Sequence, residues 1–493
     1  MSCLETFAGI EPRLVAAPAG REQPARGRAG PADWLAALTI RGPSPFAAGP
    51  LDGAARTLPG SAPPPCDAAV WLADSGSAPA TLDGFTRHGA FTVRFGDSVQ
   101  AIPLWDEVTA GRATVTTAID WHETSLAAGR CVHVAETATA HGLDVTASQT
   151  DPVVAAIRLL AEALLELRSD PGRWKARARR AAEQPAGPSR SPQRPAAGRA
   201  VRFIASKLAR SARLRATTRG REPHWFVALR RNAGASIVDS AQASFADFRE
   251  VPLPDGLAQM ADPFPFDHAG TSYLLFESVG VGSAQGRLAI ATISSTGQLS
   301  DVRQLLERDY HMSYPCVIES GGEIFLLPES SAAKRVDLFR FSPFPSTLEL
   351  VATPIDDVAL VDTTPVLVDG IWYFFTTTTV PFMETVLFWS RTIDGPWELH
   401  PASPVSCTVR NSRGAGKLFW RQGRLFRPTQ DCSERYGFAI NVNEVTRLTP
   451  TEFEERPVSY AAPGWSPRLL GTHTWNESAT WQAVDGLRLA RVG

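Results

Sequence analysis

Residues 262–277 read DPFPFDHAGTSYLLFE, and a similar pattern returns three times further along the chain. Every copy has an opening strand, a turn centred on glycine and a second strand; the later copies are SYPCVIESGGEIFLLPE at 313–329, DTTPVLVDGIWYFFTTTT at 362–379 and RGAGKLFWRQGRLFRPTQ at 413–430. Pro263, Pro315 and Pro365 are 52 and 50 residues apart. Because further strands follow each hairpin, the repeat predicts four antiparallel strands in about 50 residues, which is typical of a propeller blade.

A fifth blade can be assembled from the two ends of this region. The stretch GTHTWNESATWQAVDG at 471–486 supplies late strands, and HWFVALRRN at 224–232 lies before the first copy. Pairing between these two stretches would close a ring. The sequence therefore predicts a mainly β fold, with a five-bladed β-propeller over residues 222–493.

The rest of the chain divides by composition. Residues 1–65 are rich in Pro, Ala and Gly, which predicts a largely irregular segment. Residues 66–168 predict a small α/β domain, because strand-like stretches precede DPVVAAIRLLAEALLELRS, an amphipathic helix. We expect this helix to begin at Asp151, with Pro152 in its first turn. Residues 169–221 are strongly basic and predict an inter-domain linker.

The second half of this linker, GRAVRFIASKLARSARLR, predicts a basic amphipathic helix. Its apolar positions are Val201, Ile204, Leu208 and Ala212. Two interpretations stay open. Residues 199–215 could make peripheral contact with an anionic membrane face, or they could form a solvated helix that packs loosely on its neighbour.

The composition excludes several classes of protein. The 493 residues carry a net charge of −2, so the chain as a whole does not coat nucleic acid, and we expect no nucleic-acid partner. No run approaches about 18 apolar residues and the start MSCLETFAGIEPR has no apolar core, so we expect neither a membrane span nor a secretion signal. Six scattered cysteines predict free thiols and a cytoplasmic location. We expect no metal and no cofactor.

The opening strands of propeller blades converge on a central channel. The residues that open the copies should therefore line one pocket: Asp262, Ser313, Tyr314, Asp362, Arg413, His473 and Thr474. Asp262 and Asp362, from the first and third blades, are expected to face each other. Two carboxylates that flank a cleft are what glycoside hydrolysis needs, one as acid and one as base or nucleophile. The alternative is that each aspartate caps a turn or pairs with a neighbouring arginine.

Further polar residues are expected near the same pocket. Glu329 follows the second strand of its blade and is a candidate proton donor, with Glu277 at the equivalent place one blade earlier; an exposed loop carboxylate is the alternative for Glu329. Gln430 and Asp431 lie beside Tyr436 in a cluster that suits sugar hydroxyls, or that packs between blades. We predict catalytic roles for Asp262, Asp362 and Glu329, and substrate binding by Tyr314, Arg413, Gln430, Asp431 and His473.

The motifs ADPFPFDHAGTSYLLFE, HMSYPCVIESGGEIFLLPES, LFRFSPFP, DGPWELHPASPV and RGAGKLFWRQGRLFRPTQDCSERYG resemble a known family. It is the five-bladed propeller domain found at the N-terminus of plant glucosamine inositolphosphorylceramide transferases and in many bacterial proteins. This domain is similar to propeller glycosidases of the arabinanase and xylosidase type, whose catalytic carboxylates come from the first, third and fourth blades. The resemblance assigns the first two to Asp262 and Asp362. Arg413 and Gly414 open the fourth blade, so Glu329 or Asp431 would have to supply the proton donor.

The segment 66–168 resembles the formyltransferase-like domain that precedes this propeller in bacterial relatives, through RHGAFTVRFGD and LWDEVTAGRATVTTAI. Of the Asn, His and Asp that such catalysis requires, only His88 and Asp120 are candidates here. The resemblance therefore implies a degenerate domain.

Two functions follow as hypotheses. The first is a carbohydrate-active, glycoside hydrolase-like protein that acts on or recognises a glycan or glycolipid head group in the central pocket. The alternative is a non-catalytic glycan-binding or scaffolding module that works beside glycosyltransferases in surface polysaccharide or glycolipid assembly. Whether the chain is an enzyme, a glycosidase or a glycan-transferring one, stays open at this point, because the fourth blade lacks an acid.

Overall fold

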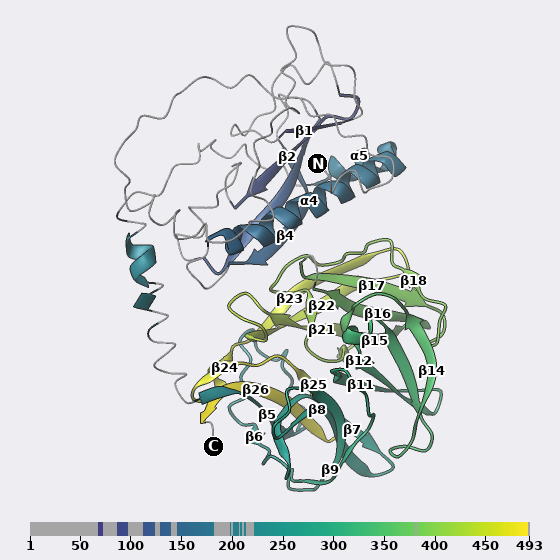
Figure 1. The fold of residues 1–493 in the computed structure, drawn as a ribbon. Coiled ribbons are helices and arrows are strands. Elements are labelled where there is room, and N and C mark those ends of the chain that lie inside the picture. Colours follow the sequence, from purple (N-terminus) through teal and green to yellow (C-terminus); the bar gives the residue numbers. More distant parts are fainter. Residues whose placement is uncertain are drawn as a thin grey trace. The chain divides into compact units, whose positions relative to one another are not determined.

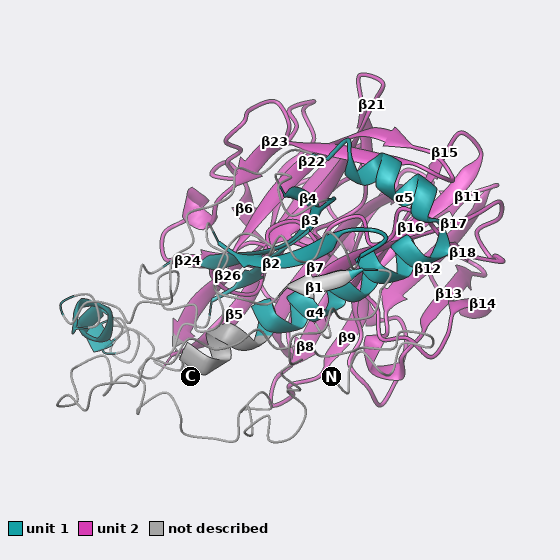
Figure 2. Cartoon of the chain, turned by 90° about the horizontal axis from the view of Figure 1, so that it is seen from above, with its two compact units in different colours: residues 1–214 teal, residues 215–493 magenta. Residues whose placement is uncertain are grey.

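The computed structural model describes residues 68–71, 86–96, 112–123, 129–139, 145–181, 198, 201–206, 208–209, 212, 221–379 and 382–491. The chain forms two compact units, residues 1–214 and residues 215–493 (Figure 2). The segment predicted to be irregular, residues 1–65, lies outside the described residues.

The first unit contains a four-stranded sheet. Its strands are β1 (Ala69–Trp71), β2 (Ala90–Phe95), β3 (Thr114–His122) and β4 (Arg130–Ala138), in that order across the sheet. β1 is parallel to β2, and the other neighbours are antiparallel. Helix α4 (Val145–Ser169) packs against β3 and β4, which buries the apolar face that the sequence pattern predicts.

Helix α4 starts earlier than predicted. It begins at Val145, so Asp151 is not its N-cap and Pro152 lies inside the helix. A proline inside a helix removes one backbone hydrogen bond. Here Pro152 is buried and its carbonyl accepts a hydrogen bond from Thr117 Oγ1 across 3.3 Å, which connects this part of the helix to the sheet.

Residues 171–178, which the sequence assigns to the linker, instead form helix α5 (Pro171–Ala178). The Asp170 side chain caps this helix by accepting a hydrogen bond from the N–H of Arg173 at 2.9 Å. Trp174 is buried, and its ring meets those of Phe91 and Trp121 edge to face, at centroid distances of 5.5 and 5.2 Å. Packing of the Trp174 ring therefore attaches this stretch to the first unit despite its basic composition.

Residues 201–206 are helical, as the amphipathic pattern predicts. Phe203 is buried in one apolar cluster with Phe95, Val115 and Ala156. Val201 and Leu208 are about half exposed. Among the described residues, no helix is both long enough and apolar enough to cross a bilayer.

In its described residues, the second unit is built from five antiparallel sheets (Figure 1). The first contains β7 (Leu257–His268), β8 (Thr271–Gly280), β9 (Gly286–Ile293) and β10 (Leu299–Gln304). The second contains β11 (Ser313–Ser320), β12 (Glu323–Glu329), β13 (Val336–Phe341) and β14 (Leu348–Ile355). The third contains β15 (Val361–Val368), β16 (Ile371–Thr378), β17 (Glu384–Ser390) and β18 (Glu398–Leu399).

The last two sheets have five strands each. The fourth contains β19 (Arg413–Gly414), β20 (Phe419–Arg421), β21 (Arg424–Asp431), β22 (Ala439–Leu448) and β23 (Phe453–Ala461). The fifth contains β24 (Leu469–Gly471), β25 (Trp475–Glu477), β26 (Trp481–Arg491), β5 (Arg221–Arg231) and β6 (Arg249–Glu250). The mainly β fold predicted for this region is confirmed.

The two ends of the second unit meet in the fifth sheet. β26 pairs with β5 along their whole length, from Trp481 opposite Arg231 to Arg491 opposite Arg221. The predicted pairing between the start and the end of this region is therefore present. Aromatic side chains fill the spaces between strands and loops, such as Phe264 against Tyr314 at 4.9 Å and Phe374 stacked on Trp397 at 3.5 Å.

Candidate functional site

The opening strands of the first three sheets share one irregularity. Asp262, Tyr314 and Asp362 have φ angles of 48°, 47° and 52°, and the pairing register shifts around each of them. Residues other than glycine rarely adopt this left-handed conformation. The same left-handed backbone conformation therefore recurs at equivalent positions of the repeat, together with the sequence pattern.

Asp262 joins three of the five sheets. Its Oδ2 accepts a hydrogen bond from the backbone N–H of Tyr314 at 3.1 Å, and its Oδ1 accepts one from Thr474 Oγ1 at 2.6 Å. The residue is 4% exposed. Burial raises the pKa of its carboxyl, against the opposing influence of His473. The side chain predicted to be catalytic is therefore already bonded to the protein through both oxygens.

Asp362 and Glu329 share one counter-ion. Arg413 Nε donates a hydrogen bond to Asp362 Oδ2 across 2.6 Å, and a terminal nitrogen of the same guanidinium lies 3.7 Å from Glu329 Oε2. Gln430 Nε2 donates to Asp362 at 3.3 Å. Because the guanidinium stays charged in proteins, Arg413 compensates negative charge on this pair of carboxyl groups.

Glu329 is buried, which excludes the interpretation as an exposed loop carboxylate. Its Oε1 accepts a hydrogen bond from Ser331 Oγ at 2.7 Å. Its Oε2 is buried without a hydrogen bond and has the Arg413 guanidinium as its charged neighbour. Glu329 therefore faces the same site as Asp362, as the sequence predicts.

His473 forms an ion pair with Asp485. Its Nδ1 lies 2.5 Å from Asp485 Oδ2, and its Nε2 lies 3.8 Å from Asp262 Oδ1. Burial alone would lower the pKa of His473, but the carboxylates of Asp485 and Asp262 raise it to about 9. The imidazole is therefore protonated at neutral pH. Trp225 stacks on its ring at 4.0 Å, and Tyr436 meets it edge-on at 5.3 Å.

The same three groups also have the spacing of metal ligands, because one ligand atom each from Asp262, His473 and Asp485 all lie within 4.8 Å of one another. A protonated imidazole donates hydrogen bonds and cannot coordinate a metal. A metal could bind here only if His473 released its proton.

Asp485 is a member of the site that sequence analysis does not find. It is fully buried on β26, and it accepts hydrogen bonds from the backbone N–H groups of His473 and Thr474 at 2.9 and 3.1 Å. It also accepts one from the N–H of Asp262 at 3.2 Å. A lone acid inside the apolar strand WQAVDGLRLA is the available signal, because a buried carboxylate needs a partner.

Glu277 also belongs to this cluster. It lies on β8 opposite Ala261, the residue before Asp262, and its Oε1 is 3.4 Å from His311 Nε2. Burial raises the pKa of Glu277 to about 8, and the carboxylate of Asp262 adds to this effect. Glu277 therefore holds a proton at neutral pH.

Residues 237–489 match the family described as "Glucosamine inositolphosphorylceramide transferase 1, N-terminal". The chain belongs to this family. The family resemblance predicted from the motifs is therefore confirmed. Apart from Trp225, the residues described above lie inside the matched range.

Two plant members of the family are recognisable relatives. The glucosamine inositolphosphorylceramide transferase 1 of Oryza sativa subsp. japonica is 31% identical over 244 residues, which cover 48% of this chain and 32% of the relative. The protein of the same name from Arabidopsis thaliana is 28% identical over 255 residues, with 50% and 32% covered. The chain thus spans about a third of the length of these relatives.

Solved structures of propeller glycosidases show distant likeness. A family 117 glycoside hydrolase from Zobellia galactanivorans gives 11% identity and a TM-score of 0.36, covering 53% of this chain and 90% of that one. The α-L-arabinanase of Cellvibrio cellulosa, complexed with arabinohexaose, gives 12% identity and a TM-score of 0.32, covering 41% and 81%.

Asp431 stands apart from the other predicted binding residues of this family domain. It accepts hydrogen bonds from Arg410 Nη1 at 3.2 Å, from the N–H of Ser433 at 2.9 Å and from Tyr460 Oη at 3.4 Å. Gln430 precedes it on β21 and contacts Asp362 instead. Neighbouring residues of a strand point to opposite faces, so Asp431 turns away from the face that Gln430 shares with Asp362.

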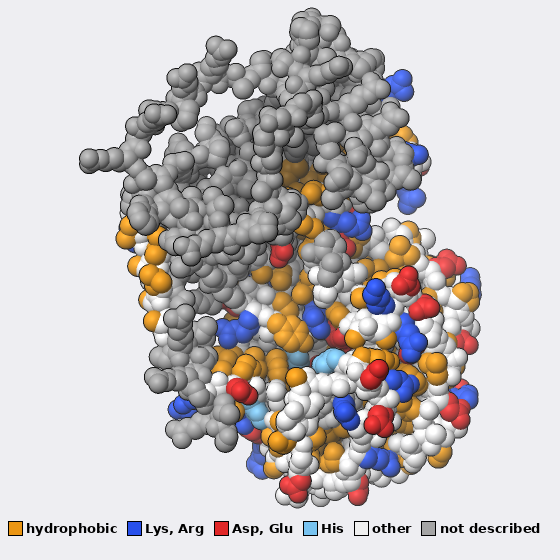
Figure 3. All heavy atoms as spheres, viewed as in Figure 1, with side chains coloured by type: hydrophobic (Ala, Val, Ile, Leu, Met, Phe, Trp, Pro, Cys, Tyr) orange, Lys and Arg blue, Asp and Glu red, His pale blue; other side chains and the backbone are white. Residues whose placement is uncertain are grey.

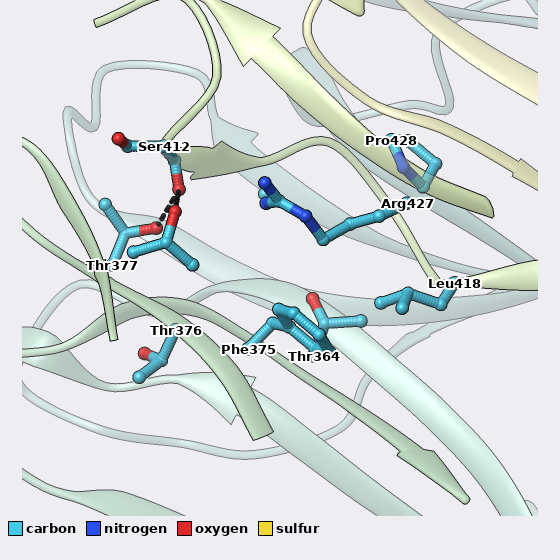
Figure 4. A pocket seen from close by; sticks show the side chains of 11 residues that line it. Thr364, Phe375, Thr376, Thr377, Ser412, Leu418, Arg427 and Pro428 are labelled. Carbon is cyan, nitrogen blue, oxygen red and sulfur yellow. Dashed lines mark hydrogen bonds between the residues drawn. The ribbon is translucent and has the colours of Figure 1, made fainter. Parts of the chain in front are cut away.

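Two cavities in the described part of the second unit are lined by residues outside this cluster. One, of about 10 Å³, is lined by Thr364, Thr376 and Thr377 of the third sheet and by Arg427 of the fourth (Figure 4). It has room for about one water molecule. The other, of about 190 Å³, is lined by Ser236, Ser240, Phe245 and Trp475 among others. The first is too small for a sugar ring, and the second is large enough for a small ligand.

The candidates in the first unit, outside the family match, are engaged in other contacts. The carboxylate of Asp120 accepts two hydrogen bonds from Arg94, at 2.9 and 3.1 Å. The backbone carbonyl of His88 accepts one from Trp121 Nε1 at 2.7 Å. Asp120 thus has an arginine as its immediate partner, which is a common structural pairing for a buried carboxylate.

Proposed function

We propose that the five sheets are the blades of a five-bladed propeller whose central channel recognises a glycan or a glycolipid head group. The channel cluster consists of Asp262, Glu277, Glu329, Asp362, Arg413, His473 and Asp485. Membership of a family named for glycosyl transfer to a glycolipid supports a carbohydrate-related role. The whole relatives are about three times as long as the matched part, so their transfer reaction itself is not assigned to this chain.

One observation carries the proposal. Charged and hydrogen-bonding side chains from all five opening segments converge at one place, where Tyr314 and Thr474 both donate to Asp262. Such groups are expensive to bury and are retained where they serve a specific interaction. Tyr436, 48% exposed, adds an aromatic face near the cluster. Fixed polar groups beside an aromatic ring are suited to a ligand with many hydroxyls.

Recognition without hydrolysis agrees best with the position of Arg413. Hydrolysis of a glycoside requires a protonated carboxyl at the leaving oxygen and a second carboxylate opposite it. Arg413 sits between Asp362 and Glu329, and it donates to the former at 2.6 Å. A permanent cation in this place compensates the charge of both groups. Because it favours the ionised form of Glu329, this residue is not suited to donate a proton.

Hydrolysis stays a second candidate because of Glu277. Its carboxyl holds a proton at neutral pH, since burial raises its pKa to about 8, and it lies across the strand pair from the residue before Asp262. A protonated glutamic acid near an aspartate is the pairing that acid–base catalysis uses. In this second candidate Glu277 would be the acid and Asp262 the base.

A glycan array read for both binding and products tests the proposal on the full chain. Asp262→Asn is compared with Asp301→Asn, because Asp301 is exposed and has the same left-handed backbone, with φ 52° against 48°. Glycan binding that is lost only in Asp262→Asn, without released sugar, supports recognition. Sugar release that is lost only in Asp262→Asn supports hydrolysis. An array on which the wild-type chain neither binds nor cleaves any glycan overturns both.

A further inference from the structure

Residues 184–221 contain ten lysines and arginines and no aspartate or glutamate. The chain as a whole has a net charge of −2, so this run concentrates positive charge in one part of a slightly acidic protein. Neither the channel cluster nor the proposed glycan recognition uses it. A block of like charges of this length is typical of a segment that binds a polyanion or an anionic surface.

Part of this run is a helix with an exposed apolar face, which consists of Val201, Leu208 and Ala212. Residues 201–206, 208, 209 and 212 are helical. Leu208 and Ala212 follow Val201 by seven and eleven positions, which places the three within about 40° of one another around the helix axis. Val201 and Leu208 are 52% and 54% exposed, and Ala212 is exposed as well. Hydrophobic side chains accordingly gather on this helix at the left edge of the view in Figure 3.

The opposite side of this helix is already buried. Phe203 lies about 160° from Val201 around the helix axis. It is 3% exposed and packs in one cluster with Phe95 and Val115. The helix is therefore attached to the first unit through Phe203, which keeps the apolar face turned outward. A helix that only covered its neighbour would carry polar side chains on its outer side.

Charge and exposure together indicate the class of partner. Arg202 is exposed next to Val201 in the chain, and no acid of the run opposes its cations, so an anionic partner fits. The exposed valine and leucine gain free energy only if this partner also removes them from water. A nucleic acid offers phosphates to the cations but no apolar medium, whereas a bilayer with anionic lipids offers charged head groups and acyl chains.

We propose that this helix binds the surface of a membrane that contains anionic lipids. The apolar face would enter the boundary between head groups and acyl chains, and the cations of the run would lie at the lipid head groups. The contact would be peripheral, with the helix in the plane of the interface. The membrane is a partner in addition to the proposed glycan, because the helix belongs to the first unit and the channel cluster to the second.

Sedimentation of the full chain with lipid vesicles tests this. One set of vesicles is phosphatidylcholine alone, and the other contains about one third phosphatidylserine. We expect about tenfold tighter binding to the anionic vesicles at low salt, and weaker binding as added sodium chloride screens the cations. Double-stranded DNA of arbitrary sequence is titrated in the same buffer, as the competing polyanion.

Two exposed positions of the second unit supply a matched control. The double variant Val201→Ser with Leu208→Ser removes the large side chains of the apolar face and should weaken binding to the anionic vesicles about tenfold. Val281→Ser with Leu399→Ser changes the same residue types where they are 75% and 59% exposed, and should leave binding unchanged. The comparison of the two vesicle types uses the wild-type chain, so the test stays valid even if a substitution prevents folding.

Preference for the anionic vesicles that is lost only in the Val201→Ser, Leu208→Ser variant supports the inference. Equal binding to both vesicle types, or binding to neither, overturns it. Binding that responds equally to the two double variants overturns it too, because the cations would then act without the apolar face. Tighter binding to DNA than to the anionic vesicles would show that a nucleic acid is the partner instead. None of these results bears on glycan recognition, which the array tests separately.

Discussion

Arg413 donates a hydrogen bond to Asp362 across 2.6 Å, and these two residues open adjacent sheets. Asp362 is 3% exposed, so the pair is shielded from water. The repeat places an acid at the first and third openings and an arginine at the fourth. At the fourth opening the chain therefore has the counter-ion of two carboxyl groups instead of a third acid.

Replacement of Arg413 should destabilise the second unit strongly. In Arg413→Gln the carboxyl groups of Asp362 and Glu329 lose their cation, and breaking a buried pair in this way costs about 3–5 kcal/mol. Urea unfolding measures the loss. The double variant Arg413→Gln with Asp362→Asn should recover part of it, because the orphaned charge is removed. A double variant as unstable as the single one would contradict the ion-pair interpretation.

The His473–Asp485 pair predicts a loss of stability at alkaline pH. The pKa of His473 is about 9 in the folded protein against an ordinary value of 6.5, so its contribution is fully present below pH 6.5 and is lost as the pH rises to about 9. Urea unfolding at several pH values should show this decline. The decline should flatten in His473→Gln and persist in His268→Gln; an unchanged slope in His473→Gln would contradict the assignment.

Glu277 predicts a stabilising substitution. Its pKa is about 8 in the folded protein against an ordinary value of 4.5, so the unfolded chain loses the proton first and stability falls as the pH rises from 4.5 to about 8. Glu277→Gln removes this penalty. We expect the variant to be more stable than the wild type near neutral pH and to approach it in acid, as measured by thermal unfolding. A variant that is less stable at neutral pH would show that Glu277 is ionised there.

The hydroxyl of Tyr314 links three of the repeats. It lies 2.8 Å from Thr364 Oγ1 and accepts a hydrogen bond from the N–H of Gly416 at 2.9 Å. Tyr314→Phe leaves this buried N–H without a partner, which costs about 1–3 kcal/mol. Tyr273→Phe is the control, because Tyr273 is only half-buried and packs through its ring against Phe344. Equal losses in the two variants would contradict the role of the Tyr314 hydroxyl.

Much of the site can be predicted from the sequence because the repeat defines equivalent positions. Alignment of the opening positions of the copies predicts site roles for Asp262, Tyr314, Asp362 and Arg413. The structure brings these residues together with His473. Glu329 joins them through its position after the second strand of the repeat.

The sequence-based prediction misplaces Asp431, misses Asp485 and misses helix α5, each for a physical reason. The sequence groups Asp431 with Gln430 by proximity, but neighbouring positions on a strand face opposite ways. Asp485 is not predicted because it lies on β26, the second strand of the fifth sheet. This sheet does not follow the hairpin pattern of the other copies. Helix α5 resembles a linker in its composition because its basic surface hides one packing residue, Trp174. Local composition carries no indication of these tertiary contacts.

The most direct test of the central claim is a crystal structure of the chain with the tightest ligand from the glycan array. The account predicts that the sugar lies at the channel cluster, with hydrogen bonds to Asp262 or its neighbours and a ring against Tyr436. A sugar bound instead in the 190 Å³ cavity lined by Ser236 and Phe245, with the channel cluster untouched, would contradict it.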